Sequence, residues 1–146
     1  MNFDTEVKLA VYRYFADTGH RPSPEDISSR VGADVPQVLA AYERLRSQRL
    51  LVLEADGSSI RMASPFSGVP TQHVVEADGI RYFANCAWDA LGILAALHKP
   101  GVAYSRCEQS HEPLHLMVSV DGPEPSDWLF HCVVPAAEWW DDIVFT

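Results

Sequence analysis

Cysteine is scarce in this 146-residue chain, which contains three cysteines, Cys86, Cys107 and Cys132. An odd and sparse set does not suit a disulfide framework, so we expect reduced thiols. Hydrophobic runs are also short, and none approaches the roughly 20 apolar residues that a membrane-spanning helix needs. The N-terminal stretch MNFDTEVKLAVYRYF lacks the basic region, apolar run and small-residue cleavage site of a secretory signal. The sequence therefore predicts a cytoplasmic protein with no membrane span.

Positive charge is nearly missing from the second half of the chain. Residues 1–64 carry 8 Lys and Arg against 9 Asp and Glu, whereas residues 65–146 carry 3 against 11. The formal net charge is −9. Because such an excess of carboxylates repels a phosphate backbone, we do not expect nucleic acid to be the main partner.

The first half of the chain predicts three helices and a hairpin. Apolar residues recur at helical spacing over residues 4–17, and two further helices begin at the capping residues Ser23 and Asp34. The stretch LLVLEADGSSIRMA predicts a hairpin that turns at Asp56-Gly57. Three helices followed by a hairpin are typical of a winged-helix unit, which we assign to residues 1–64.

A winged-helix unit raises the question of DNA binding. Four arginines on the third helix and the hairpin could contact a phosphate backbone: Arg44, Arg46, Arg49 and Arg61. However, Arg44 and Arg46 are two residues apart and so point to different sides of the helix. The unit is also nearly neutral. We therefore favour a helical module that packs on the rest of the protein over a DNA-binding module.

The second half predicts a small mixed β-sheet domain, residues 65–146. The stretch SPFSGVPTQ, residues 64–72, has the composition of a linker. After it we expect a hairpin, a helix and two strands, over residues 73–84, 85–98, 114–122 and 128–135. The predicted fold class is α+β: an N-terminal winged-helix-like three-helix unit with a hairpin, then a sheet domain whose helix carries Cys-x-x-Asp.

That Cys-x-x-Asp lies in FANCAWDALGI, where Cys86 and Asp89 are three residues apart at the start of the predicted helix. Backbone N–H groups at a helix start stabilise an anion, so we expect a lowered pKa for the Cys86 thiol. A thiolate binds soft metals, and a carboxyl group one turn away can supply a proton. The alternative is a buried core cysteine followed by an ordinary first-turn carboxylate.

Three stretches resemble the organomercurial lyases (alkylmercury lyase family). VVEADGIRYFANCAWDALGIL is similar to the family's hairpin of the form V-D-G-x-x-x-Y, which leads into a catalytic Cys-x-x-Asp. SRCEQSHEPLHLMVSVDG is similar to its S-x-C…G-E-P-x-x-L-x-V-x-x-D-G stretch, and CVVPAAEWWDDIVFT to the segment before its second catalytic cysteine. With the winged-helix-like half, the resemblance covers nearly all of residues 5–146.

The resemblance implies a detoxifying lyase that cleaves carbon–mercury bonds. The Cys86 thiolate would attack the mercury of an organomercurial, or another soft electrophile, and a second cysteine would join it. Asp89 would pass a proton to the departing carbon and release a hydrocarbon. Mercury(II) would stay on Cys86 and Asp89 until low-molecular-weight thiols or a mercuric reductase took it. The family needs no organic cofactor.

The resemblance places the second catalytic cysteine directly after WWDDIVFT, where the sequence ends at Thr146. We therefore expect either a form truncated before that cysteine or a shortened relative that has lost half of its thiol pair. Cys107 matches a family cysteine that looks structural, and we expect Cys132 to be a core cysteine on a strand. With Cys86 as the one thiol that matches a catalytic cysteine, three functions stay open: a lyase, a thiol-based module that binds or senses soft metals, and a winged-helix transcription regulator.

Overall fold

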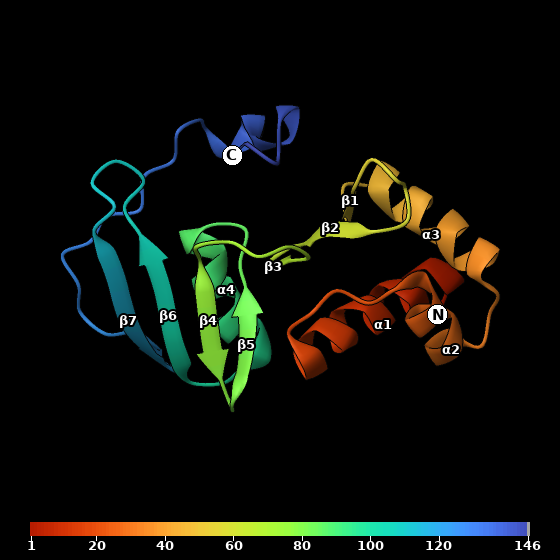
Figure 1. The fold of residues 1–146 in the computed structure, drawn as a ribbon, viewed down its shortest axis with the longest axis horizontal. Helices are drawn as coiled ribbons and strands as arrows, with labels where there is room; N and C mark the ends of the chain where they lie inside the picture. The colour runs from red at the N-terminus through yellow and green to blue at the C-terminus, as the bar shows by residue number, and fades with distance from the viewer. Residues whose placement is uncertain (146) are drawn as a thin grey trace.

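A computed structural model describes residues 1–145 of the chain (Figure 1). Its first half contains the three expected helices, α1 (Phe3–Thr18), α2 (Pro24–Val31) and α3 (Val35–Ser47). Each helix begins at a residue whose side chain accepts a hydrogen bond from the first turn; these residues are Asn2, Ser23 and Asp34. The helix starts predicted from the capping residues Ser23 and Asp34 are confirmed.

A three-stranded antiparallel sheet follows, in the order β1-β2-β3. Its strands are β1 (Val52–Leu53), β2 (Ile60–Ala63) and β3 (Phe66–Ser67). The first two form the predicted hairpin. The third comes from the stretch that we expected to be a linker, and that expectation is wrong because Phe66 is only 3% exposed and packs in the core.

The second half forms a five-stranded sheet in the order β5-β4-β6-β7-β8. Its strands are β4 (Val74–Ala77), β5 (Ile80–Phe83), β6 (Gly101–Arg106), β7 (Pro113–Ser119) and β8 (Gly122–Pro123). Every pairing is antiparallel, so the expected mixed sheet is wrong. The reason lies in the crossover helix α4 (Ala87–Leu97), which brings β6 in beside β4 instead of β5.

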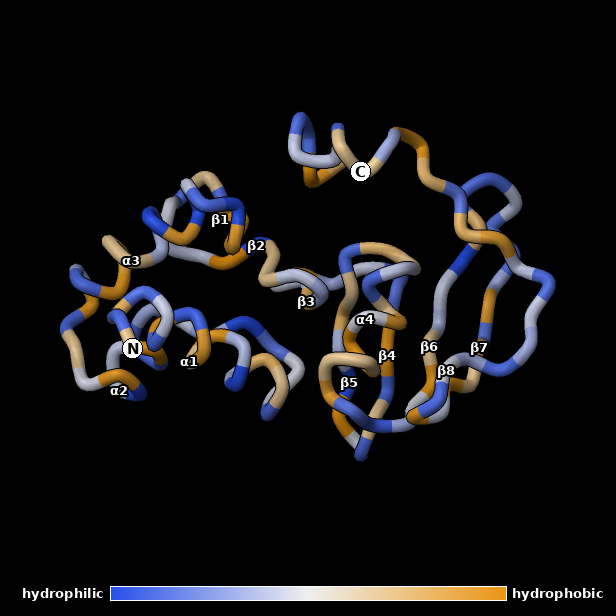
Figure 2. The backbone as a smooth tube through the Cα atoms, turned by 180° about the vertical axis from the view of Figure 1, so that it is seen from behind, coloured by the Kyte–Doolittle hydropathy of each residue, from blue (hydrophilic) through white to orange (hydrophobic). Residues whose placement is uncertain are grey.

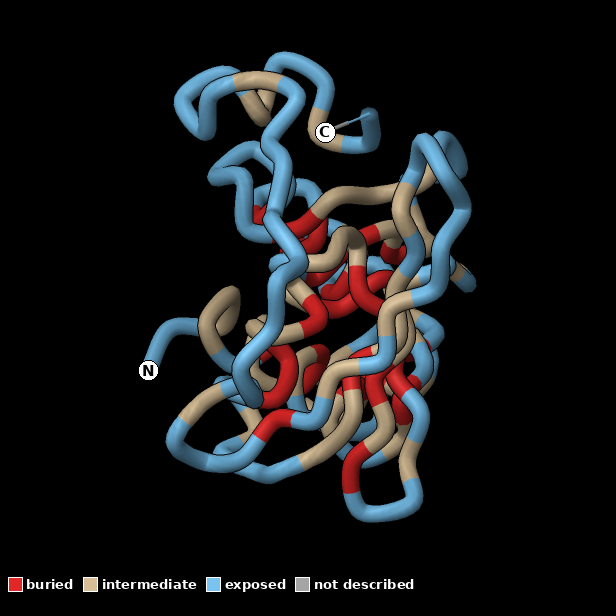
Figure 3. Tube along the Cα trace, turned by 90° about the vertical axis from the view of Figure 1, so that its left-hand side faces the viewer, coloured by how far each residue is buried: buried red, intermediate tan, exposed pale blue. Residues whose placement is uncertain are grey.

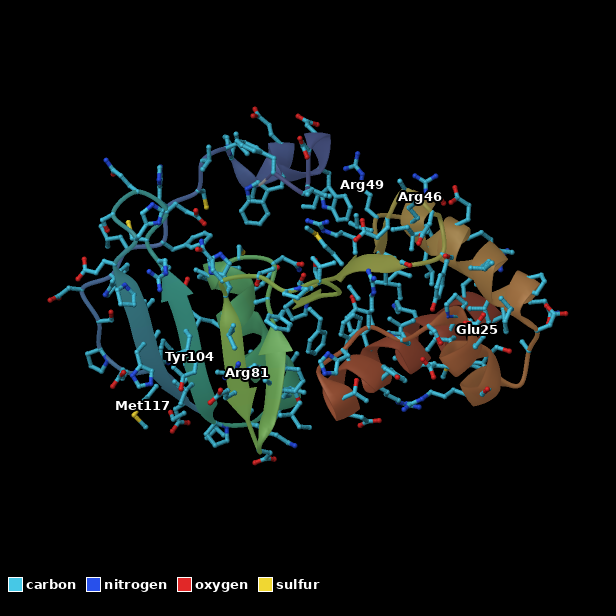
Figure 4. The ribbon with its side chains drawn as sticks, in the orientation of Figure 1. Glu25, Arg46, Arg49, Arg81, Tyr104 and Met117 are labelled. Carbon is cyan, nitrogen blue, oxygen red and sulfur yellow. The ribbon has the colours of Figure 1, made fainter. Side chains whose placement is uncertain are left out.

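Helix α4 covers one face of this sheet, through contacts with β4 and β6. Val75 and Ala103 of these strands are buried beneath it. The opposite face is uncovered by helices, and Figure 4 shows Arg81, Tyr104 and Met117 on that face. The sheet therefore has one packed face and one open face, as is common for antiparallel sheets.

One hydrophobic core joins the two halves of the molecule, as the buried centre of Figure 3 shows. The ring of Phe66 stacks on that of Phe15 in α1 and lies 5.8 Å from the ring of Tyr82 in β5. The Tyr82 hydroxyl donates to the backbone oxygen of Ala16 at 2.7 Å. These contacts fix the helical half against the sheet half.

The C-terminal segment, residues 124–145, is largely exposed (Figure 3). It includes a short 3-10 helix, η1 (Ala136–Asp141). The strand expected over residues 128–135 does not form, and Leu129 is 90% exposed. Figure 2 shows hydrophobic stretches along this exposed tube. The prediction is wrong because residues 128–135 pair with none of the described strands, so their backbone groups have no sheet partner.

Three of the four arginines considered for DNA contact, all except Arg49, lie beside carboxylates. Arg44 pairs with Asp4, and Arg46 pairs with Glu43. Figure 4 shows Arg49 near the C-terminal segment, where its guanidinium lies 5.9 Å from the Trp140 ring centroid.

The fold is thus α+β with antiparallel sheets. Within residues 1–145 no helix is long and apolar enough to cross a membrane.

Candidate active site

Cys86 and Asp89 lie together at the start of α4, as the sequence predicted. Cys86 is the N-cap residue, with extended backbone angles (φ −152°, ψ 177°), and its carbonyl accepts the first helical hydrogen bond from Ala90 at 3.1 Å. Its sulfur replaces the usual capping oxygen and accepts from the Asp89 backbone N–H at 3.4 Å. The helix start therefore holds a thiol and a carboxyl group one turn apart.

A third polar side chain, Asn85, joins this pair. Its Nδ2 donates to Oδ2 of Asp89 at 3.0 Å and lies 3.3 Å from the backbone oxygens of Pro65 and Phe66. The sequence analysis missed Asn85 because its partners before α4 lie 19 and 20 residues away. The available signal was a polar residue directly before a helix cap in an otherwise apolar run.

Burial dominates the protonation of both candidate groups. Desolvation raises the pKa of the Cys86 thiol, although the Asp89 backbone N–H works against it. Our expectation of a lowered Cys86 pKa is therefore wrong: the helix start stabilises the thiolate less than burial destabilises it. Desolvation also raises the pKa of the Asp89 carboxyl, against the hydrogen bond from Asn85. A raised pKa suits a carboxyl group that has to carry a proton.

The site lies at the junction of the two halves. Tyr12 of α1 donates to the backbone oxygen of Ser64 at 3.0 Å, and its own pKa is raised by burial and then by the charge of Asp89. On α4, a Cβ placed at Gly92 would come within 3.3 Å of the Pro65 side chain. This close approach brings the stretch between β2 and β3 against the helix that carries Cys86.

The C-terminal segment reaches the same helix. The ring of Phe130 lies 5.7 Å from that of Trp88, the second residue of α4. Two residues further on, Cys132 is exposed, so the expectation of a core cysteine is wrong. Charge on Cys132 is among the influences that raise the pKa of Cys86. The contact between Phe130 and Trp88 therefore places the segment that carries Cys132 against the helix that begins after Cys86.

The remaining cysteine, Cys107, follows β6 in the turn to β7. Its sulfur accepts from the Ser110 backbone N–H at 3.4 Å, and hydrogen bonds from Ser110 lower its pKa. The position expected for a second catalytic cysteine, after Thr146, lies outside the described residues.

Two open hollows of about 400 and 490 Å³ share Pro100 and Gly101, at the far end of α4, and neither is lined by Cys86 or Asp89. Within residues 1–145, no three His, Cys, Asp or Glu side chains converge as a metal site. The pair thus lies at a junction beneath an exposed segment.

Comparison with known families decides the relationship. The sequence pattern of the MerB family, alkylmercury lyase, matches residues 66–146, which is more than half of the chain. This chain belongs to the alkylmercury lyase family. The matched residues include the sheet half, α4 and the C-terminal segment, and therefore both Cys86 and Asp89.

The fold agrees with this family. The chain is similar to the crystal structure of the mercury-bound form of MerB2, with a TM-score of 0.65 and 22% sequence identity. The similarity covers 84% of this chain and 60% of that one, so the chain spans about three fifths of the length of that relative. No curated protein matches the chain.

Proposed function

We propose that this chain cleaves carbon–mercury bonds by protonolysis, with Cys86 as the nucleophile and Asp89 as the proton donor. The observation that carries the proposal is the cap of α4, where the Asp89 N–H lies 3.4 Å from the Cys86 sulfur. Membership of the alkylmercury lyase family supports this chemistry. The mercury of the substrate is the soft centre that a thiolate prefers over oxygen ligands.

The reaction runs in two balanced steps. The Cys86 thiolate forms a sulfur–mercury bond to R–Hg–X, and X leaves with its electron pair. The protonated Asp89 carboxyl then gives its proton to carbon as the carbon–mercury bond breaks, so R–H departs. Mercury stays in the +2 state throughout, held by the Cys86 sulfur and the Asp89 carboxylate. Burial of Asp89 favours the protonated carboxyl that the second step requires.

A second sulfur weakens the carbon–mercury bond by donating electrons to mercury. We assign this role to Cys132, which is exposed and lies two residues after Phe130, whose ring packs against that of Trp88 on α4. A low-molecular-weight thiol supplies the same donor atom when Cys132 is absent. Such thiols, or a mercuric reductase, also remove mercury(II) at the end.

The helical half fits a winged-helix-like unit, which we place at residues 1–64, with the catalytic domain at 65–146. The sheet β1-β2-β3 crosses this boundary, since β3 lies in the second range and pairs with β2. The role that we assign to the helical half is structural, because it holds the Ser64–Pro65 stretch against the site. Carboxylates beside Arg44 and Arg46 weigh against a DNA-binding regulator.

A second candidate is a module that binds or senses a soft metal without cleaving it. The exposed Cys132, in the segment whose Phe130 packs against Trp88 of α4, favours this alternative, since two thiols suffice to hold mercury(II). The two candidates differ in one observable: the lyase releases a hydrocarbon, whereas the binding module releases none.

A single-turnover assay separates these candidates. The protein is mixed with phenylmercury and excess cysteine, and benzene and bound mercury are both measured. We expect benzene from the native chain, none above the protein-free rate from Cys86→Ser, and a loss of about 10²-fold or more from Asp89→Asn. Stoichiometric mercury binding without benzene would establish the binding module instead.

A further inference from the structure

We propose that Asn85 is a positioning residue for the proton transfer: its side-chain amide fixes the Asp89 carboxyl beside Cys86 by tying it to the backbone of the Pro65–Phe66 stretch. The inference rests on the proposed function, and it adds a residue that lies outside the Cys-x-x-Asp motif. It stands on three contacts of one amide nitrogen.

The hydrogen-bond acceptors around Asn85 fix the orientation of its side-chain amide. Nδ2 of Asn85 faces three oxygen acceptors: Oδ2 of Asp89 at 3.0 Å and the backbone oxygens of Pro65 and Phe66 at 3.3 Å each. Turning the amide over would set its oxygen against the same three acceptors. The surroundings therefore fix which end of the side chain meets Asp89.

The oxygen end of the Asn85 amide also requires an explanation. Oδ1 of Asn85 is buried and has no hydrogen-bond partner among residues 1–145. A buried polar atom without a partner is uncommon in folded proteins and calls for an explanation. Positioning of Asp89 supplies one, because the Nδ2 contacts hold the side chain where Oδ1 is left unpaired.

The hydrogen bond from Asn85 determines the orientation of the Asp89 carboxyl. A carboxyl group in the first turn of a helix can turn toward solvent or back toward its own backbone. The bond from Asn85 instead holds Oδ2 on the side where Pro65 and Phe66 meet α4. Its position then depends on the core that joins the two halves. Proton transfer depends steeply on such placement, and an error of 1 Å can cost about 10²-fold in rate.

The hydrogen bond itself can be observed without any lyase activity. The chain has two asparagines, Asn2 and Asn85, so [¹⁵N]asparagine labelling gives two side-chain amide signals. We expect Asp89→Ala to move the Asn85 signal and to speed the exchange of its protons, while the Asn2 signal stays in place. An unmoved Asn85 signal would overturn the proposed contact.

The positioning role requires a second measurement, on Asn85→Asp, which keeps the shape of the side chain and removes its donors. In single turnover with phenylmercury we expect mercury capture by Cys86 at the native rate and benzene release slowed by about 10²-fold. The matched control is Asn2→Asp, the same change at the cap of α1, where a carboxylate caps as well as an amide. This control should leave both rates unchanged.

The outcomes are distinguishable. If the native chain releases benzene and Asn85→Asp releases it equally fast, the positioning role is wrong and the proposed function stands. Equal losses of capture and release, together with a lowered free energy of unfolding, would show a merely structural residue and also overturn it. If the native chain releases no benzene, the proposed function fails, and with it the catalytic role of Asn85, whereas the amide signals still report the contact.

Discussion

Phe15 of α1 and Phe66 of β3 stack nearly parallel, with ring centroids 5.2 Å apart and an interplanar angle of 9°. The same Phe66 offers its backbone oxygen to Asn85, which bonds Asp89. The packing between the two halves is therefore linked to the candidate site by one residue.

The stacked pair predicts cooperative unfolding of the whole molecule. Because the core is continuous across both halves, Phe15→Ala should lower the free energy of unfolding by about 3–5 kcal/mol. Urea unfolding followed by tryptophan fluorescence and by far-UV circular dichroism should give one coincident transition. The control Leu129→Ala, at an exposed position, should stay within about 0.5 kcal/mol of the native chain. Two separate transitions would contradict a shared core.

Cys86 and Cys107 should react with alkylating agents over different pH ranges. Burial raises the pKa of Cys86, whereas hydrogen bonds from Ser110 lower that of Cys107. Since the thiolate is the nucleophile, Cys107 should reach its full rate at a lower pH than Cys86. Iodoacetamide rates from pH 6 to pH 10 measure this order, on two variants that lack Cys132 and keep either Cys86 or Cys107 as their one thiol. A lower midpoint for Cys86 would show that the helix start outweighs burial.

Replacing Asp89 should stabilise the fold near neutral pH. Its folded pKa is raised, so its favourable contribution is complete below the unfolded value, near 3.8, and is lost as pH rises through the folded pKa. Asp89→Asn removes this loss, so the free energy of unfolding of the variant should exceed the native value increasingly from pH 4 to pH 7.5. Urea midpoints across that range provide the test.

Asp56 provides the control of opposite sign. Hydrogen bonds from Ser59 and Ser58 lower the pKa of its carboxyl to about 2, so its contribution is present above 3.8. Asp56→Asn should therefore be less stable than the native chain, by a nearly constant amount from pH 4 to pH 7.5. A pH-independent difference for Asp89→Asn as well would contradict the burial of Asp89.

Cys132 should contribute to mercury retention. Two thiols that hold one mercury(II) act as a chelate, and loss of one should weaken binding by about 10²-fold or more. Competition with dimercaptosuccinate measures this affinity in Cys132→Ser. Cys107→Ser is the matched control and should bind like the native chain. Equal retention by both variants would remove Cys132 from the site.

Much of the fold follows from short-range signals in the sequence. Capping residues mark the starts of α2 and α3, and Asp-Gly turns mark both hairpins, because these effects act within a few residues. The strand expected at residues 128–135 failed for a long-range reason. Its apolar composition suits a strand, but a strand needs a partner, and within residues 1–145 no strand pairs with this segment.

The sequence predicts the placement of Cys86 and Asp89, but neither the direction of the Cys86 pKa shift nor the contribution of Asn85. Cys86 and Asp89 share one turn of helix, so their spacing alone places them together. The raised pKa of Cys86 could not be predicted, because burial depends on the distant stretches that cover α4. Asn85 was missed for the same reason, since its role depends on backbone oxygens at Pro65 and Phe66.

The most direct test of the account is the source of the proton on the released hydrocarbon. In D₂O, single turnover of the native chain with phenylmercury should yield monodeuterated benzene, because a deuteron from an exchangeable group replaces mercury on the ring carbon. The Asp89→Asn variant then shows whether the Asp89 carboxyl delivers that deuteron. Cys86→Ser should yield none above the protein-free rate, and Asp89→Asn about 10²-fold less per unit time. Mercury bound to the native chain with no benzene, or equal benzene from Cys86→Ser, would contradict the account.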